Sequence, residues 1–207
     1  MTGVQTWLFR SVTPDVIICK QTGGANDWMS YHSVLGNTKS MRLNATDAEQ
    51  TSTTYWNDTS PTSTVFSLGS DTKGNASSTM IAYCFADVQG YSKFGSYTGN
   101  GSTDGTFVYT GFKPAFLLVK KSSAGGSDWN LHNNKSPGFN VNDNYLAPNA
   151  TAAEVTNNSF QIFDLLSNGF KCRGTGTGTN ASGETMIYMA FAENPFVTST
   201  AIPACAR

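Results

Sequence analysis

The chain has 207 residues, a formal net charge of −1 and only 13% charged residues. This composition excludes the basic surface that binds nucleic acid or an anionic membrane, so we expect neither partner. No apolar stretch approaches the ~20 residues of a membrane-spanning helix, which argues against membrane insertion. Aromatic residues make up 12% of the chain, too many for a disordered protein. The sequence therefore predicts a folded protein whose neutral surface is rich in Ser, Thr, Asn and Gly.

The sequence repeats itself after about a hundred residues. Residues 13–32 (TPDVIICKQTGGANDWMSYH) return as residues 113–132 (KPAFLLVKKSSAGGSDWNLH). Residues 75–87 (NASSTMIAYCFAD) return as residues 180–193 (NASGETMIYMAFAE). The offset grows slowly along the chain, as small loop insertions would cause. The pattern thus indicates a duplicated domain and not a short-period solenoid.

This duplication predicts a first domain at residues 1–90, a second at residues 91–195 and a C-terminal tail at residues 196–207. Short strand-like runs alternate with Gly- and Asn-containing turns, and sustained helical periodicity is absent. The pattern is typical of an all-β fold. We therefore predict two similar antiparallel β-sandwich domains, jelly-roll-like in type.

In the first copy, apolar runs between turn residues predict strands at Thr6–Phe9, Asp15–Lys20 and Thr79–Ala86. The second and third of these runs are almost continuously apolar, so we expect both to be buried on two faces. The helix-like stretches Thr46–Gln50 and Thr151–Thr156 predict one helical turn each.

The second copy predicts the same strands at Thr106–Tyr109, Ala115–Lys120 and Thr185–Ala192. The last two are again almost continuously apolar, and we expect them to be buried on two faces. An Asn-Gly signal within Phe163–Phe170 predicts a hairpin between two further strands.

The two copies differ at their starts. Residues 91–101 (YSKFGSYTGNG) predict a strand and a turn that open the second copy, while Met1 stands where Gly101 would be in the first. The first copy therefore lacks its opening strand. Either the chain is a fragment of a longer protein, or a neighbouring chain supplies the strand by edge pairing.

The four cysteines, Cys19, Cys84, Cys172 and Cys205, form no CxxC pair, which excludes zinc-ribbon and thioredoxin-like sites. Cys19 and Cys84 lie within apolar runs, where a free thiol acts as a small hydrophobic group. We expect free thiols, with Cys205 the most exposed.

His32 and His132 follow Trp28 and Trp129 at similar spacing in the two copies. One interpretation is a paired ligand site, or a Trp/His carbohydrate platform in each domain. The favoured interpretation is an exposed or half-buried strand residue, because two histidines in separate copies share a metal only if the copies face each other.

Acidic residues also recur at matching places, as Asp27 does with Asp128 and Glu49 with Glu154. Acids present twice more typically satisfy turns than form the carboxylate pair of a glycoside hydrolase. The chain has no G-x-S-x-G motif and no phosphate loop. We expect no enzyme activity, no catalytic residue, no cofactor and no metal site.

Aromatic side chains offer a candidate binding site. Tyr55 and Trp56 are adjacent, lie in a polar loop and have no counterpart in the second copy. Exposed rings of this kind stack on sugars. We predict Tyr55 and Trp56 as ligand-binding residues, whereas Trp28 and Trp129, present beside Asp in both copies, are interpreted as core.

The order of motifs in the first copy is PDVIICK, DW, LNATDAE, FSLGS and NASSTMIAYCFA; the second copy carries FKPAFLLVKK, LLSNGFK and NASGETMIYMAFAENPF. This order resembles a domain of unknown function that recurs, often in tandem, in virion structural proteins of tailed bacteriophages, marine phages in particular. The resemblance covers the chain from about Thr13 to Arg207.

The resemblance implies a non-enzymatic virion component with β-rich domains. It also implies a homo-oligomer, with a trimer favoured as in phage fibres, and contacts with other virion proteins. The leading hypothesis is a tail-fibre or adhesin component that contacts a host-surface glycan. The alternatives are a capsid decoration or head-fibre protein, a glycan-binding lectin and a depolymerase module.

Overall fold

The computed structural model describes residues 4–6, 12–136 and 140–194, which contain β-strands and no helix. The chain divides into two compact units, Met1–Ala86 (unit 1) and Asp87–Arg207 (unit 2). The expected tail, residues 196–207, lies outside the described residues, as does Cys205. The all-β prediction is confirmed, and the strands pair antiparallel throughout the described residues.

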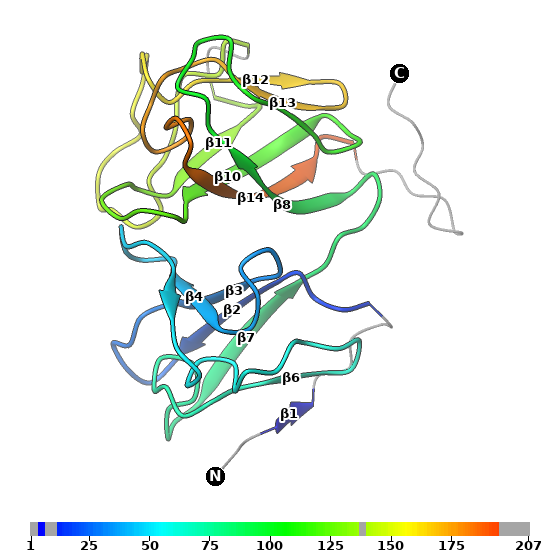
Figure 1. Ribbon diagram of the computed structural model, residues 1–207, viewed down its shortest axis with the longest axis vertical. Coiled ribbons are helices and arrows are strands. Elements are labelled where there is room, and N and C mark those ends of the chain that lie inside the picture. The colour runs from blue at the N-terminus through cyan, green and yellow to red at the C-terminus, as the bar shows by residue number, and fades with distance from the viewer. Residues whose placement is uncertain (1–3, 7–11, 137–139, 195–207) are drawn as a thin grey trace. The chain divides into compact units, whose positions relative to one another are not determined.

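Unit 1, drawn in blue to blue-green in Figure 1, contains one large and one small sheet. The large sheet has the order β5-β4-β3-β2-β7. Its strands are β2 (Val16–Gln21), β3 (Met29–His32), β4 (Lys39–Arg42), β5 (Gln50–Thr51) and β7 (Met80–Phe85). The small sheet pairs β1 (Val4–Thr6) with β6 (Val65–Ser67).

Unit 2 also contains two antiparallel sheets. The first has the order β11-β10-β14-β8 and the second the order β12-β13-β9. The first is formed by β8 (Ser92–Thr98), β10 (Pro114–Lys121), β11 (Asn130–Asn133) and β14 (Thr185–Ala192). The second is formed by β9 (Phe107–Tyr109), β12 (Phe163–Leu166) and β13 (Gly169–Cys172).

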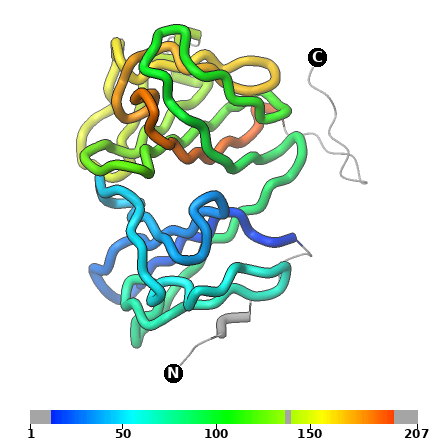
Figure 2. The backbone as a smooth tube through the Cα atoms, viewed as in Figure 1, coloured from blue at the N-terminus to red at the C-terminus, as the bar shows by residue number. Residues whose placement is uncertain are grey.

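Residues 140–162 of unit 2 are mainly irregular, as the yellow part of the tube in Figure 2 shows. Two isolated bridges, Leu131 to Leu146 and Tyr145 to Val155, tie this segment to strand β11 and to itself. It stands in the chain where unit 1 has β4 and β5.

Each unit has a core of its own. In unit 1, buried residues of β2 and β3, such as Ile17 and Met29, form one cluster with Phe66 of β6. In unit 2, Leu117 and Met186 of the first sheet cluster with Phe170 of the second. Packing between the two sheets of each unit buries the inward-facing residues of the central strands β2, β10 and β14.

Strand β7 contradicts the expected burial of the apolar run Thr79–Ala86. All its residues are partly exposed, and Tyr83 is 43% exposed. The physical reason is its place in the sheet: β7 pairs with β2 on one side, and no described strand pairs with the other side. Burial on two faces needs neighbours on both sides as well as covering layers.

Two further predictions need correction. The single helical turns expected at Thr46–Gln50 and Thr151–Thr156 are wrong, because both stretches are extended or irregular chain. The hairpin around Asn168 is confirmed, but Leu166 pairs with Gly169, which places Ser167 and Asn168 in the turn. Of the expected strand Thr6–Phe9, residues 7–9 lie outside the described residues.

Candidate functional site

Tyr55 and Trp56 are buried, with exposed fractions of 8% and 1%, so the expectation of an exposed aromatic pair is wrong. Trp56 Nε1 donates a hydrogen bond to the Lys39 carbonyl at 2.9 Å, and its ring meets that of Tyr31 edge to face at 5.5 Å. Tyr55 Oη donates to Gln50 Oε1 at 3.1 Å. Both rings complete the core of unit 1 and offer no face to a sugar.

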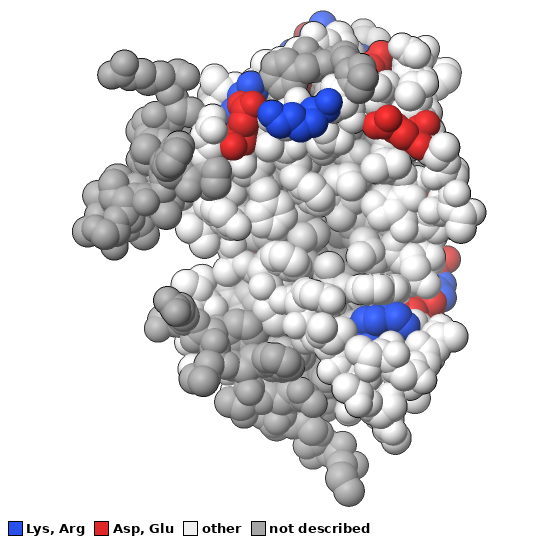
Figure 3. All heavy atoms as spheres, turned by 180° about the vertical axis from the view of Figure 1, so that it is seen from behind, with Lys and Arg blue, Asp and Glu red and all other residues white. Residues whose placement is uncertain are grey.

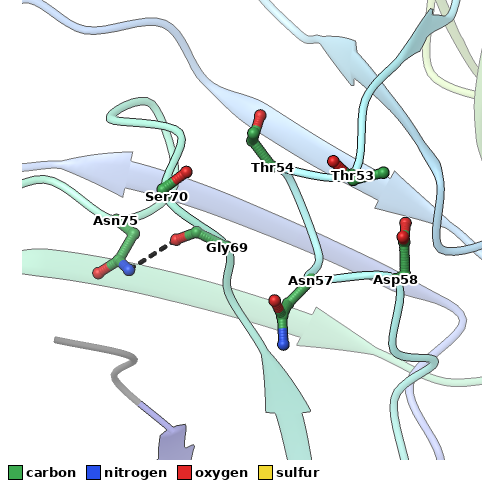
Figure 4. A pocket seen from close by; sticks show the side chains of 7 residues that line it. All are labelled: Thr53, Thr54, Asn57, Asp58, Gly69, Ser70 and Asn75. Carbon is green, nitrogen blue, oxygen red and sulfur yellow. Dashed lines mark hydrogen bonds between the residues drawn. The ribbon is translucent and has the colours of Figure 1, made fainter.

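The loop that carries these rings instead forms one wall of a polar pocket of about 350 Å³ in unit 1. The Gly69 N–H donates to the Tyr55 carbonyl at 2.9 Å and the Asp71 N–H to the Thr54 carbonyl at 3.0 Å, which ties the two walls together. The pocket is lined by Thr53, Thr54, Asn57, Asp58, Gly69, Ser70 and Asn75 (Figure 4).

The chemistry of this pocket is hydrogen bonding, mainly by neutral groups. Figure 4 shows hydroxyl and amide side chains from the two walls, with Asp58 as the one carboxylate among the lining residues. Asn75 Nδ2 donates to the Gly69 carbonyl at 2.7 Å. Positive φ angles at Asn57 (52°) and Asp58 (47°) turn the loop at its tip. Such a pocket suits a polar backbone or a hydroxyl-rich ligand.

A second pocket, of about 330 Å³, lies in unit 2 and includes an exposed ring. Tyr109 of β9 is 66% exposed, because side chains alternate along the strand and Val108 takes the buried side. Asp87 pairs with Lys93 and accepts a hydrogen bond from the Phe94 N–H at 2.7 Å. The lining residues are Asp87, Gln89, Ser92, Lys93, Tyr109, Thr110 and Gly111.

This second pocket combines an aromatic face with an ion pair and amide and hydroxyl groups, the usual means of binding a sugar. Sequence reasoning missed it. The alternation in Thr106–Tyr109 was a usable signal, but it does not say which side of the strand faces solvent.

His132 is a core residue of unit 2. It is fully buried, its Nδ1 lies 2.9 Å from Asn142 Oδ1, and its ring meets Phe163 edge to face at 4.8 Å. Burial lowers the pKa of the imidazole to about 4. His32 is also buried, at 4% exposure. Both histidines lie on strands as expected, but the expected exposure is wrong.

Asp27, Asn44 and Trp28 form a small hydrogen-bonded cluster in unit 1, which we call the Asp–Asn–Trp clip. The Trp28 N–H donates to Asn44 Oδ1 at 3.0 Å, and Asn44 Nδ2 donates to Asp27 Oδ1 at 3.0 Å. The Asn44 hydrogen bond lowers the pKa of Asp27, and Arg42 acts in the same direction. The carboxylate is therefore held ionised for a structural purpose.

Unit 2 contains the same clip. The Trp129 N–H donates to Asn149 Oδ1 at 2.8 Å, and Asn149 Nδ2 donates to Asp128 Oδ1 at 2.7 Å. Trp129 is buried, whereas Trp28 is only half-buried and stacks on Tyr83 at 6.5 Å. The interpretation of the tryptophans as core is thus confirmed for Trp129 alone.

Cys19, Cys84 and Cys172 are free thiols, as predicted. Burial raises the pKa of Cys19 and Cys172 to about 12 and that of Cys84 to about 11. Among the residues that the structure describes, no group of three or more His, Cys, Asp or Glu could hold a metal ion. In the same residues, no helix is long and apolar enough to span a membrane.

Figure 3 shows charged side chains only in small groups on a largely uncharged face of the protein. In a comparison with known families, the profile of a domain of unknown function, DUF7483, matches residues 9–195. No curated protein and no solved structure matches the chain. A single family profile therefore spans both compact units.

Proposed function

We propose, from the premise that the chain belongs to the DUF7483 family, that it is a structural component of a tailed-phage virion. We further propose that its two units are copies of one jelly-roll-like β-sandwich. The resemblance to phage virion domains supports the first part. The second rests on strand pairing within each unit and on the Asp–Asn–Trp clip present in both.

The strand pairings support duplication in detail. In unit 1, Cys19 of β2 stands opposite Ala82 of β7; in unit 2, Val119 of β10 stands opposite Tyr188 of β14. The hydrogen bonds that end these ladders also match. The Thr22 N–H donates to the Thr79 carbonyl at 3.0 Å, and the Ser122 N–H donates to the Thr185 carbonyl at 2.9 Å. Equal register at matched sequence positions favours copies over chance similarity.

The observation that carries a non-catalytic role is the structural use of the acids. Asp27 and Asp128 are held in the clips, and Asp164 pairs with Arg173. A glycoside hydrolase needs two carboxylates free to face one substrate across a groove. A depolymerase role is therefore the less favoured alternative.

Within the virion we favour a tail-fibre or adhesin component that oligomerises, as a trimer, and contacts a glycan on the host surface. The Tyr109 pocket is the site we assign to this contact. Several weak sites on one oligomer would add by avidity. A capsid decoration or head-fibre protein, and a cellular lectin, are the remaining alternatives.

The position on the particle is tested by immunogold electron microscopy of the phage that encodes the chain, with antibodies against the purified protein. Label on the fibres supports the proposal of an adhesin. Label on the head favours the alternative of a capsid decoration or head-fibre protein. Complete absence of label from intact and partly disrupted particles contradicts the virion proposal.

The glycan contact is tested by binding purified protein to a glycan array and to host cells. Tyr109→Ala should reduce binding by about tenfold, since a stacked ring contributes on the order of 1 kcal/mol or more. Phe160→Ala is the matched control, because Phe160 is similarly exposed, at 59%, but does not line the pocket. Equal effects of the two changes would contradict the assignment.

A further inference from the structure

Strand β14 of unit 2 has neighbours on both sides, β10 and β8. The Gly99 N–H donates to the Glu184 carbonyl at 3.0 Å and the Ala192 N–H to the Tyr91 carbonyl at 2.8 Å, so the ladder extends beyond both ends of β8. Strand β7, the counterpart of β14, pairs with β2 alone among the described strands. Unit 1 thus presents the edge that β8 covers in unit 2.

Tyr97 is the side chain by which β8 closes the core of unit 2. It stands opposite Met186 in register and is 7% exposed. Its ring meets that of Phe170 edge to face at 5.8 Å. Its hydroxyl donates to the Thr179 carbonyl at 2.5 Å. Tyr97 is therefore anchored at both its apolar and its polar end.

Unit 1 has an apolar hollow in the corresponding place. It is shallow, with a volume of about 10 Å³, and it is lined by Cys19, Phe66, Leu68, Gly74, Met80, Ile81 and Ala82. Three of these residues match the surroundings of Tyr97. Met80 corresponds to Met186 and Gly74 to Thr179 by sequence. Phe66 corresponds to Phe170, because each is the middle residue of a three-residue pairing with β1 or β9.

The chain that follows β8 has its own anchor in unit 2. The Asn100 N–H donates to Asn180 Oδ1 at 3.0 Å, and Asn180 Nδ2 donates to the carbonyls of Ser102 at 2.8 Å and Gly174 at 2.9 Å. Asn75, the counterpart of Asn180, retains the last of these bonds through Gly69. It lines the polar pocket of Figure 4. The hollow and the pocket thus correspond to the two places that β8 and its following turn fill in unit 2.

We propose that the β7 edge of unit 1 is a strand-acceptor site. Its occupant is an extended strand with the pattern of β8, supplied from outside unit 1 and paired antiparallel to β7. A tyrosine opposite Met80 lies over the hollow and covers its apolar lining, and the following turn reaches Asn75. This is β-strand addition, in which backbone hydrogen bonds give affinity and one buried side chain gives register. The inference stands independently of a place in a virion.

The site also has a specificity of its own. In unit 2, a Cβ atom placed on Gly95 would lie 2.8 Å from the Tyr188 hydroxyl, so a larger residue there would have to displace the Tyr188 ring. In unit 1 the residue at the Tyr188 position is Ala82, which leaves this space open. A strand for unit 1 therefore accepts a larger residue where β8 has Gly95.

The test uses the full chain and a fluorescent peptide of residues 91–103 (YSKFGSYTGNGST), with binding measured by anisotropy. The wild-type peptide should bind, and the Tyr97→Ala peptide should bind about tenfold or more weakly. A peptide with Gly95→Val should bind at least as tightly as the wild type. Hydrogen exchange with bound peptide should show new protection in residues 80–85.

The matched protein variant is Ala82→Tyr, which gives unit 1 the residue of unit 2. It should still bind the wild-type peptide, but its affinity for the Gly95→Val peptide should be about tenfold or more lower than that of the wild-type protein. Circular dichroism establishes whether this variant folds, and the peptide changes test the wild-type protein regardless. Absence of peptide binding, equal binding of the Tyr97→Ala peptide, or pairing of two copies through β7 in its place would each overturn the proposal.

Discussion

Asn180 holds Asn100 by two hydrogen bonds: the Asn100 N–H donates to Asn180 Oδ1 at 3.0 Å, and Asn180 Nδ2 lies 3.2 Å from Asn100 Oδ1. Asn180 is fully buried. Asn75, at the matching position of unit 1, lies half-buried in an open pocket. The asparagine is thus enclosed by protein in unit 2, whereas at the matching position of unit 1 it is open to solvent.

This difference predicts unequal costs of the same substitution. Asn180→Ala should lower the free energy of unfolding of unit 2 by about 2–4 kcal/mol, because it removes four hydrogen bonds made by a fully buried side chain, one of them to the buried Gly174 carbonyl. Asn75→Ala should cost unit 1 about 1 kcal/mol, since water reaches its partner. Urea unfolding of both variants measures the two values. Equal losses would show that Asn75 is as enclosed as Asn180.

His132 predicts a dependence of stability on pH. Its pKa is about 4 in the folded protein, against the ordinary value of 6.5. Above pH 6.5 the imidazole is neutral in both states. As the pH falls from 6.5 toward 4, the unfolded chain binds a proton that the folded protein does not, so stability falls. The full loss is about 3 kcal/mol.

The measurement is the free energy of unfolding between pH 6.5 and 4.5 for the wild type and for His132→Gln. The variant should have a flatter profile in this range. The lowered pKa of Asp27 affects stability at lower pH, below its ordinary value of 3.8. Parallel profiles of the two proteins would contradict the buried, neutral state of His132.

Trp56 should contribute to stability and not to ligand binding. Trp56→Ala should cost about 3–5 kcal/mol, the usual loss for a buried aromatic residue. Trp56→Phe removes the hydrogen bond to the Lys39 carbonyl but keeps most of the ring volume, and should cost less. Thermal unfolding measures both, with glycan binding measured below the transition. If the Trp56→Phe variant folds but no longer binds glycan, Trp56 contacts the ligand after all, and this prediction is wrong.

The cysteines should differ in reactivity from exposed thiols. At pH 8, Cys19 and Cys172 should remain unmodified by iodoacetamide in the folded protein, because burial keeps them protonated. Both should react completely in urea. Peptide mapping by mass spectrometry assigns the modified residues. Rapid labelling of Cys19 under native conditions would show that the edge of unit 1 opens readily.

Much of the fold follows from local pattern. Apolar runs located β2, β10 and β14 within a residue or two, because short apolar runs bounded by turn residues mark buried strands. The same reasoning failed for β7, whose apolar run is as strong as that of β14. The difference between them is a neighbouring strand, which local sequence does not contain. In unit 2 that neighbour is β8, which pairs with β14.

The site was harder to predict. Tyr55 and Trp56 lie in a polar loop, and sequence alone does not reveal that the rings turn inward to Gln50 and Lys39. Tyr109 faces solvent because its neighbour Val108 is buried, a choice made by the packing of unit 2. Exposure of an aromatic residue is a property of tertiary structure, and polar neighbours along the chain are weak guides to it.

The most direct test of the open edge is amide hydrogen exchange of the free chain, resolved by residue. Thr79 and Phe85 accept hydrogen bonds from the β2 side, so alternation turns the Ala82 and Cys84 N–H groups outward. These two amides should exchange many-fold faster than Tyr188 and Ala190, whose N–H groups face β8. Equal protection of the two pairs would mean that the β7 edge is already covered, and would contradict the strand-acceptor site.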